Sequence, residues 1–412
     1  MPIDQKELGR RLKVAREAAK MTQEAVAEKI GIGRPALSLM ESAERAVSSL
    51  ELDKLCFIYG RDIADFLGDS FADRNTLATF WRINEDILER PETEKILNEA
   101  LVMAREQTRL EQMLDIERPQ PIAVYKLADP KRKQEAVEQG AIIAEQERQR
   151  LGLGFGPIEN LPDLMESQGI RTHQTALADN ISGFTMNDDE CGPIVVINNH
   201  HAPVRRRYSY AHECAHVLMD RLKLGIVTRE SERASLFEMR ANSFAANFLM
   251  PERGVRQYLA RLGKDQVSRT RAAVFDENGV VPVEYRTTGD QHIKLYDIVE
   301  LANFFGVSRA AAAYRLLNLR LLTQTELQDL LEQDKQNGQS LARMLKLNSE
   351  PRDIANPDHT HRFLSLALEA LRRNEVTLAK FRELVALISI PGHEVEQLLK
   401  TAQISDVCAE AR

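Results

Sequence analysis

The sequence of 412 residues has little cysteine, no long apolar run and no excess of positive charge. Its cysteines are scattered without close pairs, which is typical of reduced cytosolic thiols rather than of a disulfide framework. No apolar run reaches the ~18 residues that suggest a membrane-spanning helix, and the N-terminus lacks the apolar core of a signal peptide. We therefore expect a cytoplasmic protein without a membrane partner.

The net charge of −7 argues against a protein coated with nucleic acid along its length, although it allows one small DNA-binding module. The hydrophobic fraction of 43% is normal for a soluble globular chain. A chain of this length typically folds as about two to four domains. The patterns described below predict a multidomain and mainly α fold.

The strongest chemical signal is the segment His-Glu-Cys-Ala-His at residues 212–216. Two histidines four residues apart lie on one face of a helix, about 5–6 Å apart at Cβ, so both imidazoles can reach one ion. Glu213 can then hold a water as general base without being a ligand. Apolar residues at 192–198 and 217–219 predict that this helix is buried. Because buried imidazoles need partners, the pattern indicates a hydrolytic metal site.

A third ligand is expected, because a catalytic zinc site typically has three protein ligands and one open position. Glu238 is favoured, since it lies three residues before Ala241 on the apolar stripe of a helix that we expect to end near Pro251. Glu230 and Glu232 are alternatives in a more polar context. Both Zn²⁺ and Mn²⁺ suit two histidines and one carboxylate, so the donor set leaves the ion open.

Residues from about 135 to 260 resemble the ImmA/IrrE family of zinc metallopeptidases. The resemblance rests on seven segments in order: 144–154, 157–161, 169–170, 181–185, 194–198, 205–213 and 238–251. It implies an α+β zincin-like domain with a small sheet, the zinc ligands His212, His216 and Glu238, and the base Glu213. It also implies a protein substrate, typically a repressor that is cleaved in response to stress or DNA damage. The sequence departs from the family at Cys214, which we expect to point away from the metal.

Residues 7–67 show the pattern of a helix-turn-helix bundle. Thr22 suits the N-cap of a second helix, and a glycine turn at 31–33 leads into a third helix at 34–41. The segment resembles the XRE/Cro-type DNA-binding domain. By that resemblance, four residues face a double-stranded DNA operator: Gln23, Arg34, Pro35 and Ser38. Arg34 would be the main base reader, because arginine reading guanine is the commonest specific contact.

Two features of this segment depart from the family pattern. Gly33 replaces the usual capping serine, and groove-facing positions that are often polar are occupied by Pro35 and Leu39. The first 34 residues are only mildly basic, so the electrostatic contribution to DNA binding is expected to be modest. A helical bundle used for protein contact is the alternative interpretation.

The patterns divide the chain into five predicted parts. They are a helix-turn-helix domain (1–70), a helical connector (71–134), the metallopeptidase domain (135–260), a helix-turn-helix-like accessory region (261–345) and a C-terminal helical unit (346–412). Apolar stripes at 81–88 and 96–113 suit a connector or dimerisation bundle. Residues 271–290 are expected to form a loop or a strand pair. The helix-turn-helix-like piece at 295–322 could bind DNA, but packing beside the peptidase domain or substrate docking is favoured.

The leading hypothesis is a transcriptional regulator that forms a homodimer and carries a zinc-dependent endopeptidase. The peptidase would cleave a repressor-type protein, or the chain itself, in a stress response. The alternative is a DNA-binding regulator whose metallopeptidase-like domain is a non-cleaving sensor or scaffold. Two further hypotheses concern single residues: Tyr208 or Tyr210, just before the metal helix, stabilises an oxyanion, and Cys191 acts as a redox-sensitive zinc ligand.

Overall fold

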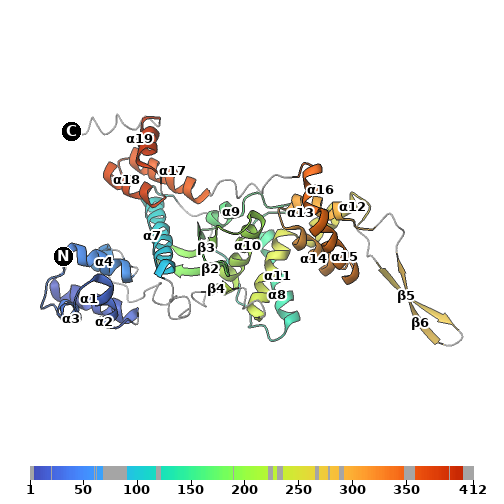
Figure 1. Ribbon diagram of the computed structural model, residues 1–412, viewed down its shortest axis with the longest axis horizontal. Helices are drawn as coiled ribbons and strands as arrows, with labels where there is room; N and C mark the ends of the chain where they lie inside the picture. Colours follow the sequence, from blue (N-terminus) through green and yellow to red (C-terminus); the bar gives the residue numbers. More distant parts are fainter. Residues whose placement is uncertain are drawn as a thin grey trace.

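The chain forms a row of helical bodies with a four-stranded sheet near the middle and the helix-turn-helix bundle at one end (Figure 1). The structure is a computed structural model that describes residues 4–19, 21–59, 61, 63–67, 91–116, 122–188, 190–220, 226–229, 235–264, 269–276, 279–286, 292–347, 358–388 and 390–401. None of the described helices has the length and apolar character needed to cross a membrane. The predicted multidomain, mainly α fold is confirmed.

The N-terminal bundle consists of α1 (Gln5–Ala18), α2 (Gln23–Ile30), α3 (Arg34–Glu41), α4 (Ser49–Tyr59) and α5 (Ile63–Leu67). Thr22 caps α2, because its side-chain oxygen accepts a hydrogen bond from the Ala25 N–H at 3.1 Å. Gly31 then ends α2 in the left-handed conformation, with φ of 78°. The resulting turn sets α3 across a shared apolar core, as the helix-turn-helix pattern predicts.

The central part combines a four-stranded sheet with helices on both sides. Its elements are α8 (Lys133–Arg150), α9 (Leu161–Ser167), β1 (Arg171–Thr175), β2 (Ile181–Asp188), β3 (Gly192–Asn198), α10 (Pro203–Met219), β4 (Ile226–Arg229), α11 (Leu236–Leu249) and α12 (Glu252–Ala260). The strand order is β1-β3-β2-β4, with β1 parallel to β3 and β2 antiparallel to both of its neighbours. This arrangement confirms the predicted small sheet of an α+β domain.

The two faces of the sheet are covered by different helices. Successive side chains of a strand point to opposite faces. In β3, Val195 and Ile197 therefore pack in the core that contains α10 and α11, whereas Ile194 and Val196 pack with α7 (Pro91–Met113), for example with Leu101. Part of the expected connector thus forms one layer of the central domain. The apolar stripe at 81–88 lies outside the described residues.

The far end of α7 also carries the C-terminal helices α17 (Asp358–Arg372), α18 (Leu378–Leu387) and α19 (Gly392–Thr401). Leu110 of α7 and Leu114, the residue directly after this helix, share a buried cluster with Phe363 and Leu384. Near its other end, the Asn98 side chain donates a hydrogen bond to the Phe57 carbonyl of α4 at 3.0 Å. One helix therefore contacts the N-terminal bundle, the sheet and the C-terminal unit (Figure 1).

The accessory region contains the antiparallel hairpin of β5 (Arg269–Asp276) and β6 (Gly279–Arg286), so of the two predicted forms it is the strand pair. It continues with α13 (Leu295–Phe305), α14 (Arg309–Asn318), α15 (Gln324–Gln333), the π-helix η4 (Asp334–Gly338) and α16 (Gln339–Met344). The Arg315 guanidinium of α14 donates to the Met250 carbonyl and to Asn247 Oδ1, at 2.9 and 2.7 Å. Since helices α10 to α16 share one apolar cluster, this region packs beside the central domain as expected.

Because α10 and α14 share this core, we expect a destabilising mutation in α14 to destabilise α10 as well. We expect Leu316→Ala, at a fully buried position, to cost about 2–5 kcal/mol and to accelerate hydrogen exchange of the α10 amides. Tyr314→Ala on the same helix is the control, because that side chain is 52% exposed. Faster exchange confined to α13–α16 would contradict a single cooperative unit.

Candidate metal centre

The helix α10 supplies three of the four residues of the candidate centre. It starts with Pro203 in its first turn and is buried on all sides over 209–218, between the sheet and α11. His212 and His216 are 3% and 1% exposed, and Glu213 is fully buried. Because burial leaves these groups without solvent as a partner, their hydrogen bonds must come from the protein or from a bound group.

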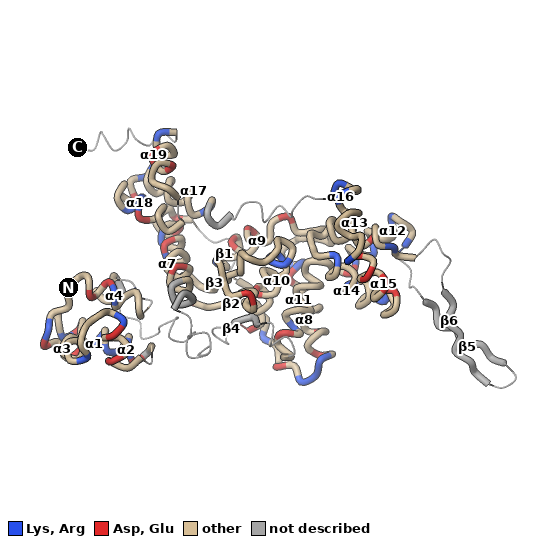
Figure 2. The backbone as a smooth tube through the Cα atoms, in the orientation of Figure 1, with Lys and Arg blue, Asp and Glu red and all other residues tan. Residues whose placement is uncertain are grey.

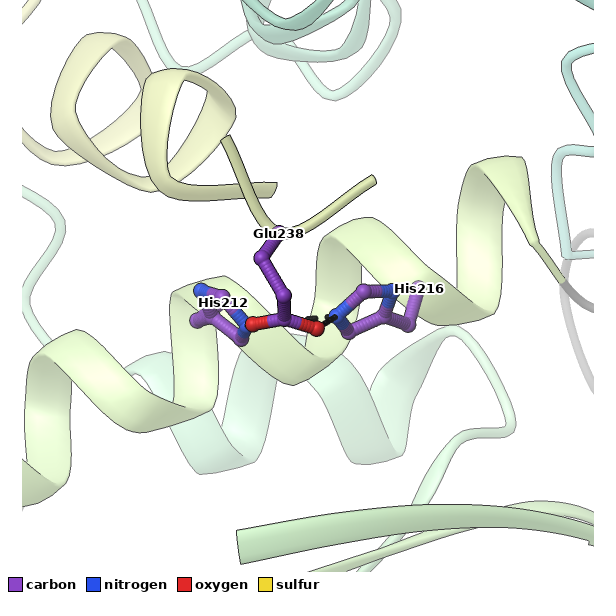
Figure 3. Close-up of side chains that lie close together, drawn as sticks. All are labelled: His212, His216 and Glu238. Carbon is purple, nitrogen blue, oxygen red and sulfur yellow. Dashed lines mark hydrogen bonds and ion pairs between the residues drawn. The ribbon is translucent and has the colours of Figure 1, made fainter. Parts of the chain in front are cut away.

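The fourth residue, Glu238, enters from the first turn of α11. Ser235 caps that helix by accepting a hydrogen bond from the Glu238 N–H, at 3.2 Å. One carboxylate oxygen of Glu238 lies 3.1 Å from His212 Nε2, and the other lies 3.2 Å from His216 Nε2 (Figure 3). The two Nε2 atoms are 3.2 Å apart.

These three side chains form a group that could hold a metal ion. Within the described part of the chain, one ligand atom from each of His212, His216 and Glu238 lies within 4.8 Å of the others. The alternatives Glu230 and Glu232 lie outside the described residues. The structure therefore brings together the residues that the sequence favoured, although their role as ligands stays a prediction.

Each histidine has a second partner on its other ring nitrogen. His216 Nδ1 lies 3.0 Å from Asp220 Oδ2, and His212 Nδ1 lies 3.1 Å from Asn242 Oδ1. Both arrangements leave Nε2 directed at Glu238, and such outer acceptors are typical of metal-binding histidines. The sequence analysis missed these partners, although helical spacing could have indicated them. Asp220 lies four residues after His216, and Asn242 lies four residues after Glu238.

Glu213 has a different environment from the three converging side chains. Its Oε2 accepts a hydrogen bond from the Thr185 hydroxyl of β2 at 2.6 Å, while its buried Oε1 has no hydrogen-bond partner among the described residues. Gly183 leaves no room for a side chain next to this carboxylate, because a Cβ there would lie 2.8 Å from the Val196 carbonyl oxygen and 3.4 Å from Glu213 Oε1. Glu213 is therefore anchored at one oxygen and has the other available, which is the arrangement a general base requires.

Charge also favours a divalent cation at this site. Three buried carboxylates, those of Glu213, Asp220 and Glu238, face two histidines and the guanidinium of Arg240. Burial lowers the pKa of His216, but its bonds to Asp220 and Glu238 outweigh this and raise the pKa to about 10. Burial raises the pKa of Glu238, but bonds from both histidines lower it to about 2. If both histidines are neutral, a dication balances the negative charge that Arg240 leaves on the three carboxylates. The donor set therefore fits Zn²⁺ or Mn²⁺.

The two tyrosines lie elsewhere than expected. Both Tyr208 and Tyr210 are inside α10 rather than before it, because the helix already starts at Pro203. The Tyr208 hydroxyl donates to Asn242 Oδ1 at 3.0 Å and so supports the partner of His212. Tyr210 is buried in the apolar core, with 1% exposure. Neither position supports the oxyanion hypothesis.

The two cysteines near the centre have structural surroundings. The Cys191 thiol donates to Asp188 Oδ1 at 3.3 Å and packs in the cluster under α7, away from the core that contains α10. Burial, together with Asp188, raises the pKa of this thiol. The proposed redox ligand thus has another partner. Cys214 is buried in the apolar core beside α11, as expected for a side chain that points away from the metal.

The residues predicted to contact DNA lie on or near α3. Arg34 and Pro35 are exposed, and Ser38 is half-buried. Gln23 is turned inward, because its amide donates to Glu41 Oε2 at 2.9 Å, and Glu41 also pairs with Arg16 at 2.6 Å. Acidic and basic residues are interspersed over the bundle (Figure 2), in line with the modest basic character of the sequence. A DNA contact is thus compatible with the geometry of Arg34 and stays a prediction for all four residues.

Comparisons with known proteins identify two domains. Residues 165–317 match the family model of the IrrE N-terminal-like domain, and residues 7–66 match that of a helix-turn-helix domain. No curated protein matches the chain. Among solved structures, ComR from Streptococcus suis aligns over 97% of this chain and 96% of its own, at 13% identity and a TM-score of 0.16, which is too low to support an argument. The chain therefore contains an N-terminal helix-turn-helix domain and, further along, a domain of the IrrE N-terminal-like type.

Proposed function

We propose that the protein is a DNA-binding transcriptional regulator with its own zinc-dependent endopeptidase, which cleaves a repressor-type protein or the chain itself in a stress response. The observation that carries this proposal is the convergence of His212, His216 and Glu238 beside a separately anchored Glu213. This combination of two histidines, a third carboxylate and an adjacent base is the arrangement of zinc hydrolases.

In this proposal, His212, His216 and Glu238 hold the zinc. When bound, zinc supplies Lewis acidity, which lowers the pKa of water and polarises a carbonyl group. Glu213 accepts the proton of the attacking water at Oε1 and passes it to the nitrogen of the leaving amine. The Thr185 hydroxyl holds Oε2 at 2.6 Å, so the carboxylate keeps one orientation through both proton transfers.

The direct test of cleavage uses purified full-length protein loaded with zinc and a library of peptides and folded DNA-binding proteins. New N-termini, in the library or in the chain itself, would be identified by mass spectrometry, with metal-free protein as the control. Zinc-dependent cleavage supports the proposal. Sedimentation of the protein with and without DNA tests the homodimer that the proposal includes.

The burial of the cluster favours a second candidate function, that of a metal-dependent sensor. Side-chain exposure is 4% for His212, 0% for His216 and 5% for Glu238, so a substrate has little direct access. In that case the same experiment would yield no new N-termini, while zinc would change the affinity of the protein for its operator.

The DNA-binding part of the proposal is tested by substituting Arg34, an exposed residue in the first turn of α3. We expect Arg34→Ala to weaken binding to an operator selected from random double-stranded DNA by about 1–3 kcal/mol, roughly 5- to 150-fold, and to relax specificity at one base pair. Lys13→Ala, at an exposed position of α1, is the matched control and should weaken binding uniformly across sequences, if at all. Unchanged operator affinity in Arg34→Ala would remove Arg34 as the base reader.

A further inference from the structure

We infer that Asp220 and Arg240 are positioning residues that set the metal affinity of the candidate centre. Their ion pair orients His216 and joins the two helices that supply the ligands. The inference rests on the proposed metal site, but it does not depend on whether the site cleaves peptides.

The two carboxylate oxygens of Asp220 bind different partners, His216 and Arg240. It is the C-cap residue of α10, and its own N–H donates to the His216 carbonyl at 2.8 Å. Its Oδ2 lies 3.0 Å from His216 Nδ1, while its Oδ1 accepts from Arg240 Nη2. With a carboxylate as acceptor, His216 carries its proton on Nδ1, and Nε2 is left for the ion. Asp220 is 3% exposed, so water does not compete for either oxygen.

Arg240 connects this carboxylate to the helix of the third ligand. It lies two residues after Glu238 on α11 and is 1% exposed. Its Nη1 donates to Gln139 Oε1 of α8 at 3.1 Å, and its guanidinium stacks 5.2 Å from the centroid of the Phe237 ring. The guanidinium is thus held from α8 and α11 while it binds the end of α10.

This ion pair joins the ligand helices more directly than the chain does. The covalent link between α10 and α11 passes through β4 at the edge of the sheet. The Asp220–Arg240 pair instead bridges the end of α10 and the first turns of α11, in contact with His216 and two residues from Glu238. Metal affinity depends on how well the ligands are held before the ion arrives, so we expect the bridge to act on affinity.

The two histidines differ in their outer acceptors. His212 bonds to the neutral amide of Asn242, which also accepts from the Tyr208 hydroxyl. His216 bonds to a carboxylate, and a charged acceptor makes the ring a better donor to a cation. Of the two outer residues, we therefore expect Asp220 to have the larger electrostatic effect on a bound cation.

The test compares Asp220→Asn and Arg240→Lys with wild type as full-length proteins. Zinc affinity would be measured by competition with a chromophoric chelator, the ligand geometry by the visible spectrum of the Co²⁺-loaded protein, and stability by the melting temperature with and without zinc. We expect zinc affinity to fall by about 10- to 100-fold in Asp220→Asn, with a changed Co²⁺ spectrum. Arg240→Lys keeps the charge but loses the forked geometry, and we expect a smaller loss.

A purely structural role gives a different result. Melting temperatures with and without zinc would then fall by equal amounts, while the zinc affinity and the Co²⁺ spectrum stay as in wild type. That outcome overturns the inference. Zinc binding with no cleavage would refute the peptidase and leave this inference intact, whereas wild-type protein that binds neither ion would overturn the metal site and the inference with it.

A measurement on wild-type protein covers the case in which the variants do not fold. Nitrogen-15 NMR of histidine-labelled, zinc-loaded protein reports which ring nitrogen carries the proton. We expect His216 to show a protonated Nδ1, hydrogen-bonded to a carboxylate, and a metal-bound Nε2. A metal-bound Nδ1 would overturn the inference.

Discussion

Glu213→Gln is expected to reduce peptide cleavage by about 10²- to 10⁴-fold while zinc affinity stays as in wild type. Glutamine keeps the shape of the side chain, and its amide oxygen can still accept the hydrogen bond from the Thr185 hydroxyl. It cannot take a proton from water, because the amide nitrogen replaces the oxygen that has no partner among the described residues. Cleavage rates and zinc content measured on the same preparations would separate loss of the base from loss of the metal.

Thr185→Val is a useful comparison for this variant. It retains the carboxylate of Glu213 but removes the hydroxyl that orients it. We expect an intermediate loss of rate, smaller than that of Glu213→Gln, because the base is still present but less well positioned. If Glu213→Gln cleaved as fast as wild type, Glu213 would not be the base.

His216→Ala is expected to abolish stoichiometric zinc binding and the stabilisation that zinc gives to the wild type. A ligand that binds only the folded state stabilises it by about 2.7 kcal/mol at 100 times its dissociation constant. His216 is the histidine with both ring nitrogens engaged by carboxylates, at 3.0 Å from Asp220 and 3.2 Å from Glu238. Its loss removes one ligand and leaves Asp220 with Arg240, and Glu238 with His212, as the remaining partners.

The measurement is the melting temperature and the metal content of wild type and variant, each with saturating zinc and after treatment with a chelator. We expect a zinc-dependent shift in the wild type that the chelator reverses, and no shift in His216→Ala. His200→Ala is the matched control, because that histidine is exposed in the turn before α10. Equal zinc shifts in wild type and His216→Ala would exclude His216 as a ligand.

The parts of the site that follow from spacing along one helix could be predicted from the sequence. His212 and His216 share a face of α10 because they are four residues apart, and Glu238 lies on the inward stripe of α11. The boundaries of α10 were less accurate. Pro203 marks the true first turn, which places Tyr208 inside the helix.

Contacts between separate elements could not be predicted in the same way. The partnership of Thr185 with Glu213 depends on how β2 packs against α10, and local periodicity does not encode that register. The same holds for α7, where the apolar stripe is visible in the sequence but its partners are not. Leu101 packs against the sheet, whereas Leu110 packs against the C-terminal helices.

The side chains of β2 alternate between the two faces of the sheet, and this has a mechanical consequence. Thr185 on one side of the strand holds the catalytic base of the proposal, and Phe184 on the other side packs with α7. Only the thickness of one strand separates the Glu213 carboxylate from a helix that both terminal units contact. Close-packed interiors transmit displacement rather than absorb it. A shift of α7 that is started at Phe57 or at Phe363 would therefore reach the carboxylate through a single layer of backbone.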